Sequence, residues 1–280
     1  MRDKVTGLIF SCDKFSDLWD GNIKLFDQNW PDRDFETFIV TDKPTDREIP
    51  GIGIIAAGAD LEWSDRLKYA LQFVKTDYVF VTLDDYFLIK TVDNNKMKDY
   101  LELMILGGYD YFRFYPRPKA ATRSELKGFK GIYNVDTSCN YSVNLYSCFW
   151  SKKFLEYVVT EPKNAWMFEV SLSKQAVKYG AKCLCSYNED YLILDVVRKG
   201  KILHKAKRYF DRHPGIYEGN REIQSWKYET KLWVKTLFAR YTPKFLIKPF
   251  RALFVKSGGK SFTQSTNHKN NYALRDNHTL

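Results

Sequence analysis

Two adjacent carboxylates, Asp84 and Asp85, interrupt the otherwise apolar run YVFVTLDDYFLIK. Such a pair can close a strand with a solvated turn, or it can bind a hard divalent cation, because Mg²⁺ and Mn²⁺ prefer oxygen ligands. Asp13 and Asp42 also follow apolar runs that have the composition of strands. Because parallel strands end at one edge of a sheet, and ligands of open α/β sheets bind there, we expect these four acids to meet at one edge.

The elements that must position these acids alternate in the first half of the chain. Strand-like runs that are apolar on both faces are separated by segments with helical spacing, which predicts a parallel sheet covered by helices. The expected fold class is therefore α/β, with a Rossmann-like, mostly parallel sheet flanked by helices. The expected strands lie at 5–13, 35–42, 51–58, 78–88 and 109–116, and the expected helices at 17–28, 64–75 and 93–106.

The second half of the chain has a different character. Residues 116–135 are polar, basic and rich in Gly and Pro, which favours a mobile loop that could close over a ligand as a lid. From residue 222 onward, aromatic and aliphatic residues recur at helical spacing up to Pro243, and the tail from 258 is polar enough to be disordered. Between these segments we expect a strand at 141–150, helices at 152–160 and 164–180, and a strand-rich stretch at 183–197.

Composition limits the cellular setting and the kind of partner. The five cysteines form no CxxC pair, which argues against a disulfide framework or a zinc site and for a reducing compartment. The first residues do not have the pattern of a signal peptide, and no apolar run reaches the length of a membrane span, so we expect a cytoplasmic location. Residues 199–260 carry 16 Lys and Arg against 4 Asp and Glu, which indicates an anionic partner.

Three explanations of this basic segment stay open. It could bind nucleic acid, it could form solvated helices, or it could lie on an anionic membrane surface. No nucleic-acid motif is present, whereas Trp and Phe residues alternate with Lys and Arg as in interfacial helices. We therefore expect a basic amphipathic helical segment that holds the protein peripherally at the inner face of the cell membrane, without nucleic acid.

The order of these motifs resembles a known family. An opening strand LIFSCD, a second strand ending in TD and a fourth ending in LDD, followed by Glu169 and His204, are similar to GT-A-fold glycosyltransferases. The bacterial enzymes that build capsules and lipopolysaccharide O-antigens are the most similar type. The resemblance covers roughly residues 4–215 and implies a catalytic domain at 1–215, with a nucleotide-sugar half at 1–115 and an acceptor half at 116–215. Residues 216–257 would then form the membrane-associating segment, and 258–280 the tail.

The resemblance implies roles for the acids and for two residues later in the sequence, His204 and Lys205. Asp85 would bind a divalent metal, Mn²⁺ or Mg²⁺, that bridges the donor diphosphate, and Asp84 would lie on the ribose side. His204 would complete the metal or phosphate site, with Lys205 among the cations that hold the diphosphate. Tyr86 follows where a strict Asp-x-Asp motif has a third acid, so this chain departs from that motif. A solvated turn, and a structural or surface histidine, are the alternative explanations.

The resemblance also implies a donor pocket and a catalytic base. Asp42 would read the uracil of a UDP-sugar, Asp13 would approach the nucleotide, and Arg66 would pair with the donor sugar or phosphates. Glu169 would take the proton from the acceptor hydroxyl in an inverting transfer, and Trp166 would stack on an acceptor sugar. A turn-capping Asp, a solvent-exposed helical Arg and an ordinary helical Glu are the alternatives at these positions, and the rival bases are Glu189 and Asp190.

The predicted function is transfer of a sugar from a nucleotide-diphospho-sugar to a lipid-linked or oligosaccharide acceptor in surface polysaccharide synthesis. Two other functions stay open at this point. A sugar-nucleotide nucleotidyltransferase would share the sheet and the acids but should have a Gly-rich, Arg-bearing loop after the first strand, where this chain has SCDKFSD. A non-catalytic membrane or nucleic-acid adaptor would need neither the acid pair nor Glu169.

Overall fold

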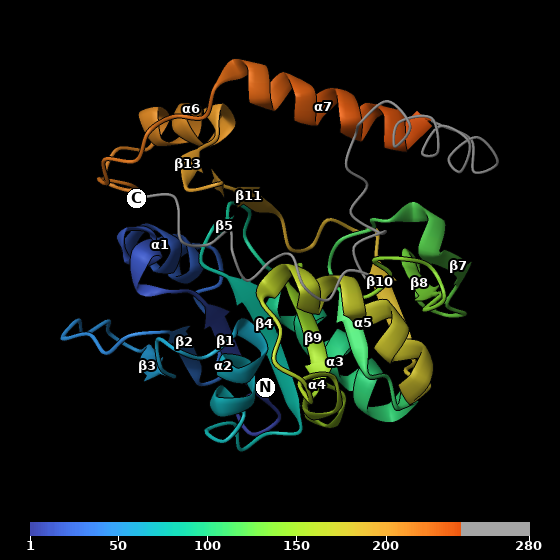
Figure 1. Cartoon of the computed structure of the whole chain (residues 1–280). Helices are drawn as coiled ribbons and strands as arrows, with labels where there is room; N and C mark the ends of the chain where they lie inside the picture. Colours follow the sequence, from blue (N-terminus) through green and yellow to red (C-terminus); the bar gives the residue numbers. More distant parts are fainter. Residues whose placement is uncertain (242–280) are drawn as a thin grey trace. The chain divides into compact units, whose positions relative to one another are not determined.

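A computed structural model describes residues 1–241 of the 280-residue chain (Figure 1). The chain divides into two compact units, Met1–Ile223 and Gln224–Leu280, which are considered separately. In the second unit the described structure consists mainly of helix α7, Trp226–Tyr241, which lies within the helical stripe expected from the sequence. The expected break at Pro243 and the expected tail at 258–280 lie outside the described residues.

A nine-stranded sheet forms the centre of the first unit, with the order β3-β2-β1-β4-β9-β6-β10-β8-β7. Strands β3, β2, β1 and β4 are mutually parallel, β9 runs antiparallel to both β4 and β6, and β6 and β10 are parallel again. The strand bounds are β1 Val5–Phe10, β2 Thr37–Thr41, β3 Gly53–Ala56, β4 Tyr78–Leu83, β6 Tyr111–Arg113, β7 Thr122–Glu125, β8 Ile132–Val135, β9 Cys148–Ser151 and β10 Cys183–Ser186.

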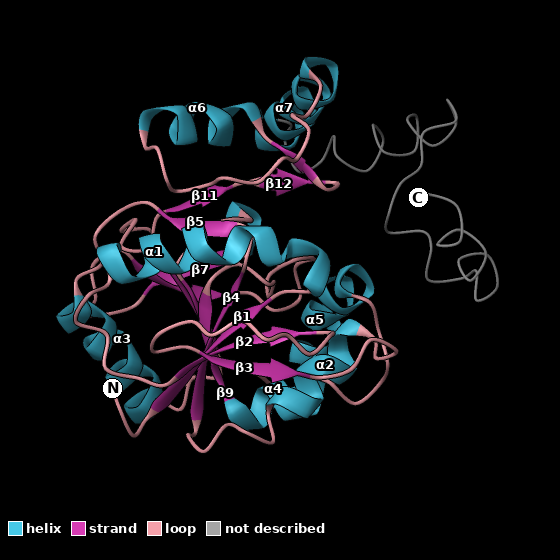
Figure 2. Cartoon of the chain, turned by 90° about the vertical axis from the view of Figure 1, so that its left-hand side faces the viewer, coloured by secondary structure: helices cyan, strands magenta, loops and turns pink. Residues whose placement is uncertain are grey.

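Helices cover both faces of this sheet, which gives two separate cores (Figure 2). Successive side chains of a strand point to opposite faces, so Leu8 and Phe10 of β1 join one core and Val5 and Ile9 the other. Helices α2, Trp63–Ala70, α4, Lys152–Val158, and α5, Ala165–Tyr179, cover the first face; α1, Trp19–Asn29, and α3, Asn94–Gly107, cover the second. The expectation of an α/β fold with a mostly parallel sheet between helices is confirmed.

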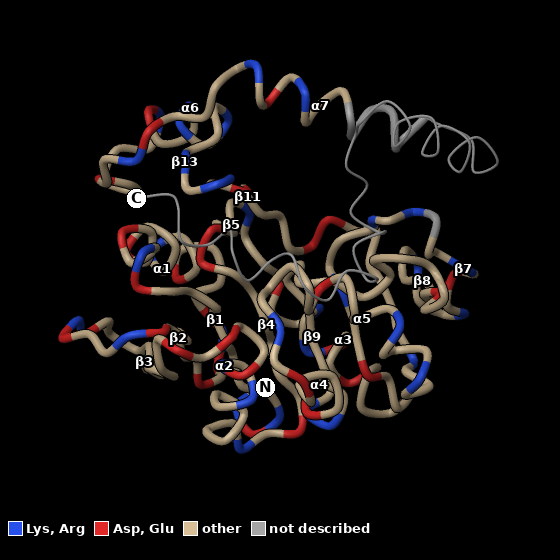
Figure 3. The backbone as a smooth tube through the Cα atoms, in the orientation of Figure 1, with Lys and Arg blue, Asp and Glu red and all other residues tan. Residues whose placement is uncertain are grey.

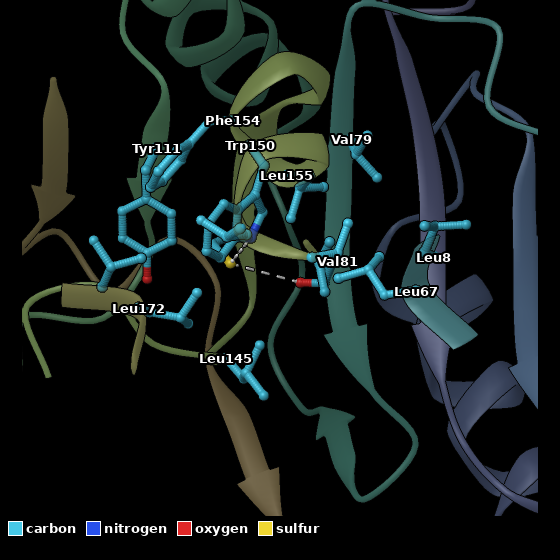
Figure 4. Packing of buried hydrophobic residues seen from close by; sticks show 14 of the residues in the cluster. Leu8, Leu67, Val79, Val81, Tyr111, Leu145, Trp150, Phe154, Leu155 and Leu172 are labelled. Carbon is cyan, nitrogen blue, oxygen red and sulfur yellow. Dashed lines mark hydrogen bonds between the residues drawn. The ribbon is translucent and has the colours of Figure 1, made fainter. Parts of the chain in front are cut away.

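The first core is packed tightly around strand β9. Trp150 is fully buried, and its ring stacks on Phe154 at 5.4 Å and meets Tyr111 edge-on at 4.6 Å between centroids (Figure 4). Its indole N–H donates to the Cys148 sulfur at 2.8 Å, so no polar atom of the ring is left unsatisfied.

A third, smaller core lies beyond the carboxyl ends of the strands. It joins α1 to two short ladders and to α6, with Phe87, Leu194 and Phe210 among its buried members. The ladders pair β5, Tyr86–Leu88, with β11, Ile193–Asp195, and β12, Val197–Arg198, with β13, Lys201–Ile202; α6 spans His204–Arg212. This layer faces the edge at which the acids were expected. Within residues 1–241 no helix combines the length and apolarity needed to cross a bilayer.

The expectation of a mobile loop at 116–135 is wrong. This segment contains the short helix η2, Lys119–Ala121, and the antiparallel hairpin β7–β8, and β8 also pairs with β10. The two ends of β8, Ile132 and Val135, are apolar and buried, and Arg123 of β7 forms an ion pair with Asp136 at 2.5 Å. The polar residues between these positions lie on an edge hairpin, which sequence polarity alone does not distinguish from a loop.

The expected strand at 141–150 is also shorter than predicted, because ladder pairing begins only at Cys148. Residues 216–223, which the sequence placed in the C-terminal segment, belong to the first unit. They reach α1 at Gly21, where an added Cβ atom would lie 1.8 Å from the carbonyl oxygen of Ile216.

This close approach gives a test of the fold. Alanine normally favours a helix interior over glycine by about 0.5–1 kcal/mol. We expect Gly21→Ala to destabilise the protein instead, by about 1–3 kcal/mol or more, because the methyl group would displace the backbone at Ile216. Urea denaturation measures the change, and Gln28→Ala on the exposed face of the same helix is the control. Equal or greater stability of Gly21→Ala would contradict the packing of residue 216 on α1.

Candidate active site

The carboxyl ends of β1 and β4 lie side by side and are joined through Asp84. The Asp84 backbone N–H donates to the Phe10 carbonyl at 3.0 Å, and the Ser11 hydroxyl donates to the Asp84 carboxylate. The Trp19 indole N–H in turn donates to the Ser11 oxygen at 2.6 Å, and the Asn22 amide donates to the Asp84 carbonyl at 3.0 Å. Asp84 is therefore buried and held in one orientation between the two strands.

Asp85 follows directly but has a different environment. Its Oδ1 atom is buried and has no hydrogen-bond partner among the described residues. Burial, and after it the charge of Asp195, raises the pKa of Asp85 to about 7. Burial and the neighbouring Asp85 likewise raise the pKa of Asp84 well above its usual range. Two adjacent carboxyls with raised pKa values at the ligand edge of a sheet are typical of a functional site.

Strand β11 brings a further acid to this point. The β5–β11 ladder pairs Tyr86 with Asp195, and the Val196 N–H donates to the Asp85 carbonyl at 2.9 Å. One Asp195 oxygen accepts from the Arg198 guanidinium at 2.6 Å, while its Oδ1 atom is buried and unpartnered in the part of the chain that the structure describes. The sequence analysis missed Asp195; only its position at the end of the apolar run YLIL could have indicated it.

Glu169 lies on α5 and is partly buried. Its Oε1 atom accepts from the Leu145 N–H at 3.3 Å, and burial raises its pKa although the Arg198 charge acts in the opposite direction. Burial first, and then the charges of Asp85, Asp195 and Glu169, raise the pKa of the Tyr86 phenol. The charges of the predicted metal ligand and of the predicted base thus both act on this phenol.

Three tyrosines form an aromatic surface beside these acids. The rings of Tyr115 and Tyr146 stack at 4.2 Å with 18° between their planes, and Tyr86 lies 5.5 Å from Tyr146. All three are half-buried. Burial, and after it the charges of Tyr115 and Asp195, raise the pKa of the Tyr146 phenol. Trp166, the predicted acceptor contact, lies three residues before Glu169 on α5 and is 38% exposed.

The predicted donor residues lie together at the ends of β1 and β2. The Asp13 N–H donates to the Asp42 carboxylate at 2.6 Å, and Arg66 of α2 donates to the Ser11 carbonyl at 3.1 Å. Burial alone would raise the pKa of Asp42, but this backbone N–H and the Arg66 charge outweigh it and hold the pKa below its usual range. The Arg66 Nε atom is buried without a hydrogen-bond partner among the described residues.

His204 and Lys205 open helix α6. The Leu203 N–H donates to the Val196 carbonyl at 2.9 Å, so His204 follows a residue that is tied to the segment after Asp195. Lys205 is exposed, and basic residues lie along β13 and α6 together with acidic ones on α6 (Figure 3). Within the described residues no three His, Cys, Asp or Glu side chains are grouped to hold a metal, so ligands from a bound molecule would have to complete one.

The rival base Asp190 has a structural role. Its oxygens accept from the Tyr100 hydroxyl at 2.5 Å and from Lys96 at 3.1 Å, both on α3. The neighbouring Glu189 has a positive φ of 51°, and its carbonyl accepts from Lys90 at 3.0 Å. These contacts fix the turn before β11 on the α3 side of the sheet.

Arg221 is a second residue that the sequence analysis did not single out. Its guanidinium donates twice to Asp17, at 2.7 Å each, and to the carbonyls of Lys14 at 2.6 Å and Gly200 at 3.2 Å. It also lies 4.3 Å from the centre of the Phe15 ring. Arg221 therefore ties the segment before α7 to the short helix η1, Asp13–Leu18, that begins at the site.

Comparison with known proteins adds information about the fold. No family model matches the chain, and no curated protein matches it. The solved mannosyltransferase PcManGT from Pyrobaculum calidifontis, in complex with GDP-Man and Mn²⁺, matches 94% of this chain and 77% of its own at a TM-score of 0.50 and 12% identity. This likeness supports a GT-A-like fold and nothing finer.

Two shorter matches are weaker. TarS 1–349 from S. aureus has a TM-score of 0.43 and 10% identity over 67% of this chain, and the bifunctional IspDF from Campylobacter jejuni has 0.41 and 16% over 69%. This chain spans only 59% and 52% of those two chains.

The Arg221–Asp17 pair gives a pH-dependent prediction. Burial would raise the pKa of Asp17, but the hydrogen bonds from Arg221 and Tyr217 outweigh it and lower the pKa. The pair therefore stabilises the fold above the unfolded-state pKa of about 4, and this contribution is lost as the pH falls through the lower folded-state value. We expect Arg221→Gln to cost about 1–3 kcal/mol at pH 7.

Urea denaturation between pH 7 and pH 3 measures this difference, with Arg208→Gln on the exposed side of α6 as the control. The difference in the free energy of unfolding between Arg221→Gln and the unmodified protein should become smaller below about pH 4, as Asp17 becomes protonated. A difference that stays constant down to pH 3 would contradict the role of the Asp17 charge.

Proposed function

We propose that the protein is a glycosyltransferase that moves a sugar from a nucleotide-diphospho-sugar, a UDP-sugar, to a lipid-linked saccharide in surface polysaccharide synthesis. The observation that carries the proposal is the position of Asp85 just after β4 of a GT-A-like sheet, with a buried Oδ1 atom that has no hydrogen-bond partner among the described residues. The strand order changes direction beside β1 and β4, where open α/β sheets bind nucleotides.

The donor nucleotide would lie over the ends of β1 and β2. Asp42 keeps its charge there because it accepts a backbone N–H and lies near Arg66, so it can accept from a base N–H. Asp13 is half-exposed beside it and pairs with Lys43 at 3.2 Å. The buried, unpartnered Nε of Arg66 would donate to a donor phosphate or sugar oxygen. Asp84, which accepts a hydrogen bond from the Ser11 hydroxyl, would lie on the ribose side of the donor.

A divalent cation, Mn²⁺ or Mg²⁺, fits the environment of Asp85. A buried carboxylate oxygen with no hydrogen-bond partner is costly, and a hard cation would satisfy it. Asp85 would hold the metal, with His204 on the adjacent segment and diphosphate oxygens as further ligands. When bound, such an ion offsets the charge that develops on the departing nucleoside diphosphate. Lys205 at the exposed start of α6 would contact the diphosphate.

Glu169 would act as the general base of an inverting transfer. Its carboxylate is held by the Leu145 N–H, and burial raises its pKa toward the range in which a carboxylate accepts a proton efficiently near neutral pH. The acceptor sugar would lie between this carboxylate and aromatic faces, with Trp166 of the same helix and the stacked Tyr115 and Tyr146 as stacking partners.

The basic C-terminal segment would bring the enzyme to its acceptor. Residues 199–260 carry 16 Lys and Arg, and α7 exposes Trp226 and Trp233 by 63% and 62% of their surfaces. Exposed indoles among cations favour an anionic membrane surface, where each cation contributes about 1 kcal/mol. A peripheral position at the inner face of the cell membrane would allow the active site to use a lipid-linked saccharide.

A binding screen tests the donor assignment. We expect UDP-sugars, with Mn²⁺ present, to raise the melting temperature of the full chain, because a ligand at 100 times its Kd stabilises by about 2.7 kcal/mol. GDP-sugars and free nucleotides serve as comparisons, and Arg66→Gln should weaken the effect whereas Arg208→Gln should not. If no nucleotide or sugar nucleotide stabilises the protein, with or without Mn²⁺, the proposed function is wrong.

Substitution of Glu169 tests the base. We expect Glu169→Gln to lower kcat for sugar transfer by about 10²–10⁴-fold with little change in donor binding, because the amide cannot accept the proton. The acid limb of the kcat/KM profile should lie above the range of an ordinary carboxyl, since burial raises the pKa of Glu169. Full activity of Glu169→Gln would assign the base elsewhere.

A further inference from the structure

We infer that Asp195 is a second protein ligand of the divalent cation, and that Asp85 and Asp195 each contribute one carboxylate oxygen to it. The inference extends the proposed function, from which it takes the presence of a cation at Asp85. Asp195 lies 110 residues further along the chain, on strand β11. None of the motifs in the first half of the sequence points to it.

The first argument is the position of the two carboxylates. The β5–β11 ladder ends where Tyr86 pairs with Asp195, and the Val196 N–H holds the Asp85 carbonyl at 2.9 Å. Both acids therefore leave the backbone at the same end of this small ladder.

The second argument is the state of their oxygen atoms. Among the described residues, four buried side-chain nitrogen or oxygen atoms have no hydrogen-bond partner, and the only two oxygens of the four are Oδ1 of Asp85 and Oδ1 of Asp195. Buried polar atoms in folded proteins are nearly always satisfied, and an exception requires an explanation. One hard cation between two neighbouring carboxylates would satisfy both oxygens and remove their mutual repulsion.

The third argument is that Asp195 is oriented for such a role. Its other oxygen accepts from Arg198 at 2.6 Å, and this leaves Oδ1 as the oxygen available to a cation. Metal-binding carboxylates are commonly held by an outer hydrogen bond of this kind. Asp84 does not have this arrangement, because its carboxylate already accepts from Ser11 between β1 and β4. Arg198 is thus a positioning residue, and Asp195 the ligand.

Binding of Mn²⁺ tests the inference directly. Electron paramagnetic resonance of free Mn²⁺, titrated into the full chain with and without UDP, gives the affinity without any assay of transfer. We expect Asp195→Asn to weaken Mn²⁺ binding at least tenfold, and Asp85→Asn to weaken it as much or more. Asp211→Asn, an exposed acid that pairs with Lys207 on α6, is the matched control and should bind as the unmodified chain does.

A melting experiment adds a second measurement. Without metal, Asp195→Asn should melt close to the unmodified protein, because it removes a like charge beside Asp85 but also the charge that pairs with Arg198. With Mn²⁺ the unmodified protein should melt at the higher temperature, since the variant has lost one of the two proposed ligands. Asp and Asn side chains have nearly the same volume, so the substitution leaves no cavity. If the variant nevertheless folded poorly, its melting temperature without metal would be clearly lowered.

The outcomes separate this inference from the proposed function. Unchanged Mn²⁺ affinity of Asp195→Asn, with loss in Asp85→Asn, overturns the role of Asp195 and leaves the proposed function standing. A chain that binds UDP-sugars equally in EDTA and takes up no Mn²⁺ also overturns it, and the two oxygens would then share a proton or water. Absence of any sugar-nucleotide binding would instead contradict the proposed function itself.

Discussion

The hydrogen-bond chain from Trp19 through Ser11 to Asp84 is the interaction on which the candidate site depends. It joins the ends of β1 and β4 at the point where the sheet changes direction, and it uses a buried carboxylate to do so. A buried carboxyl group of this kind is tolerated only with close hydrogen-bond partners. Because Asp84 cannot turn, the next residue must leave the strand in a fixed direction, and this delivers Asp85 to the layer formed by β5 and β11.

Two acids at equivalent strand ends show how environment separates their roles. Asp42 accepts a backbone N–H and lies near Arg66, so its pKa falls and it stays charged. Asp85 is more deeply buried, lacks a partner for one oxygen and faces Asp195, so its pKa rises to about 7. A carboxylate whose charge is already balanced by nearby donors, such as Asp42, suits a hydrogen bond from a neutral N–H group. A carboxylate that lies near a second acid and lacks donors, such as Asp85, suits a cation. Under the proposed function, the same residue type would thus make two different contacts along one sheet edge.

The sequence predicted those parts of the site that follow directly from strands. Asp13, Asp42 and the Asp84–Asp85 pair end apolar runs, and the alternation of elements predicted the parallel sheet that aligns them. It could not predict Asp195 or Arg221, because their partners are set by the small ladders and by a contact 204 residues away in the chain. The hairpin at 122–135 was missed for a related reason, since its pairing with β10 outweighs a local composition that favours a loop.

Arg198 links the two halves of the site. Its guanidinium holds Asp195, and its charge lowers the pKa of both Asp85 and Glu169, against burial that raises them. A ligand carboxylate must be ionised to bind a cation, and a general base must be ionised to accept a proton. One arginine would therefore favour the required form of both groups, although Asp85 follows β4 and Glu169 lies on α5, far apart in the chain. If Asp85 holds a cation and Glu169 accepts a proton, as proposed, Arg198 would be the counter-charge that they share.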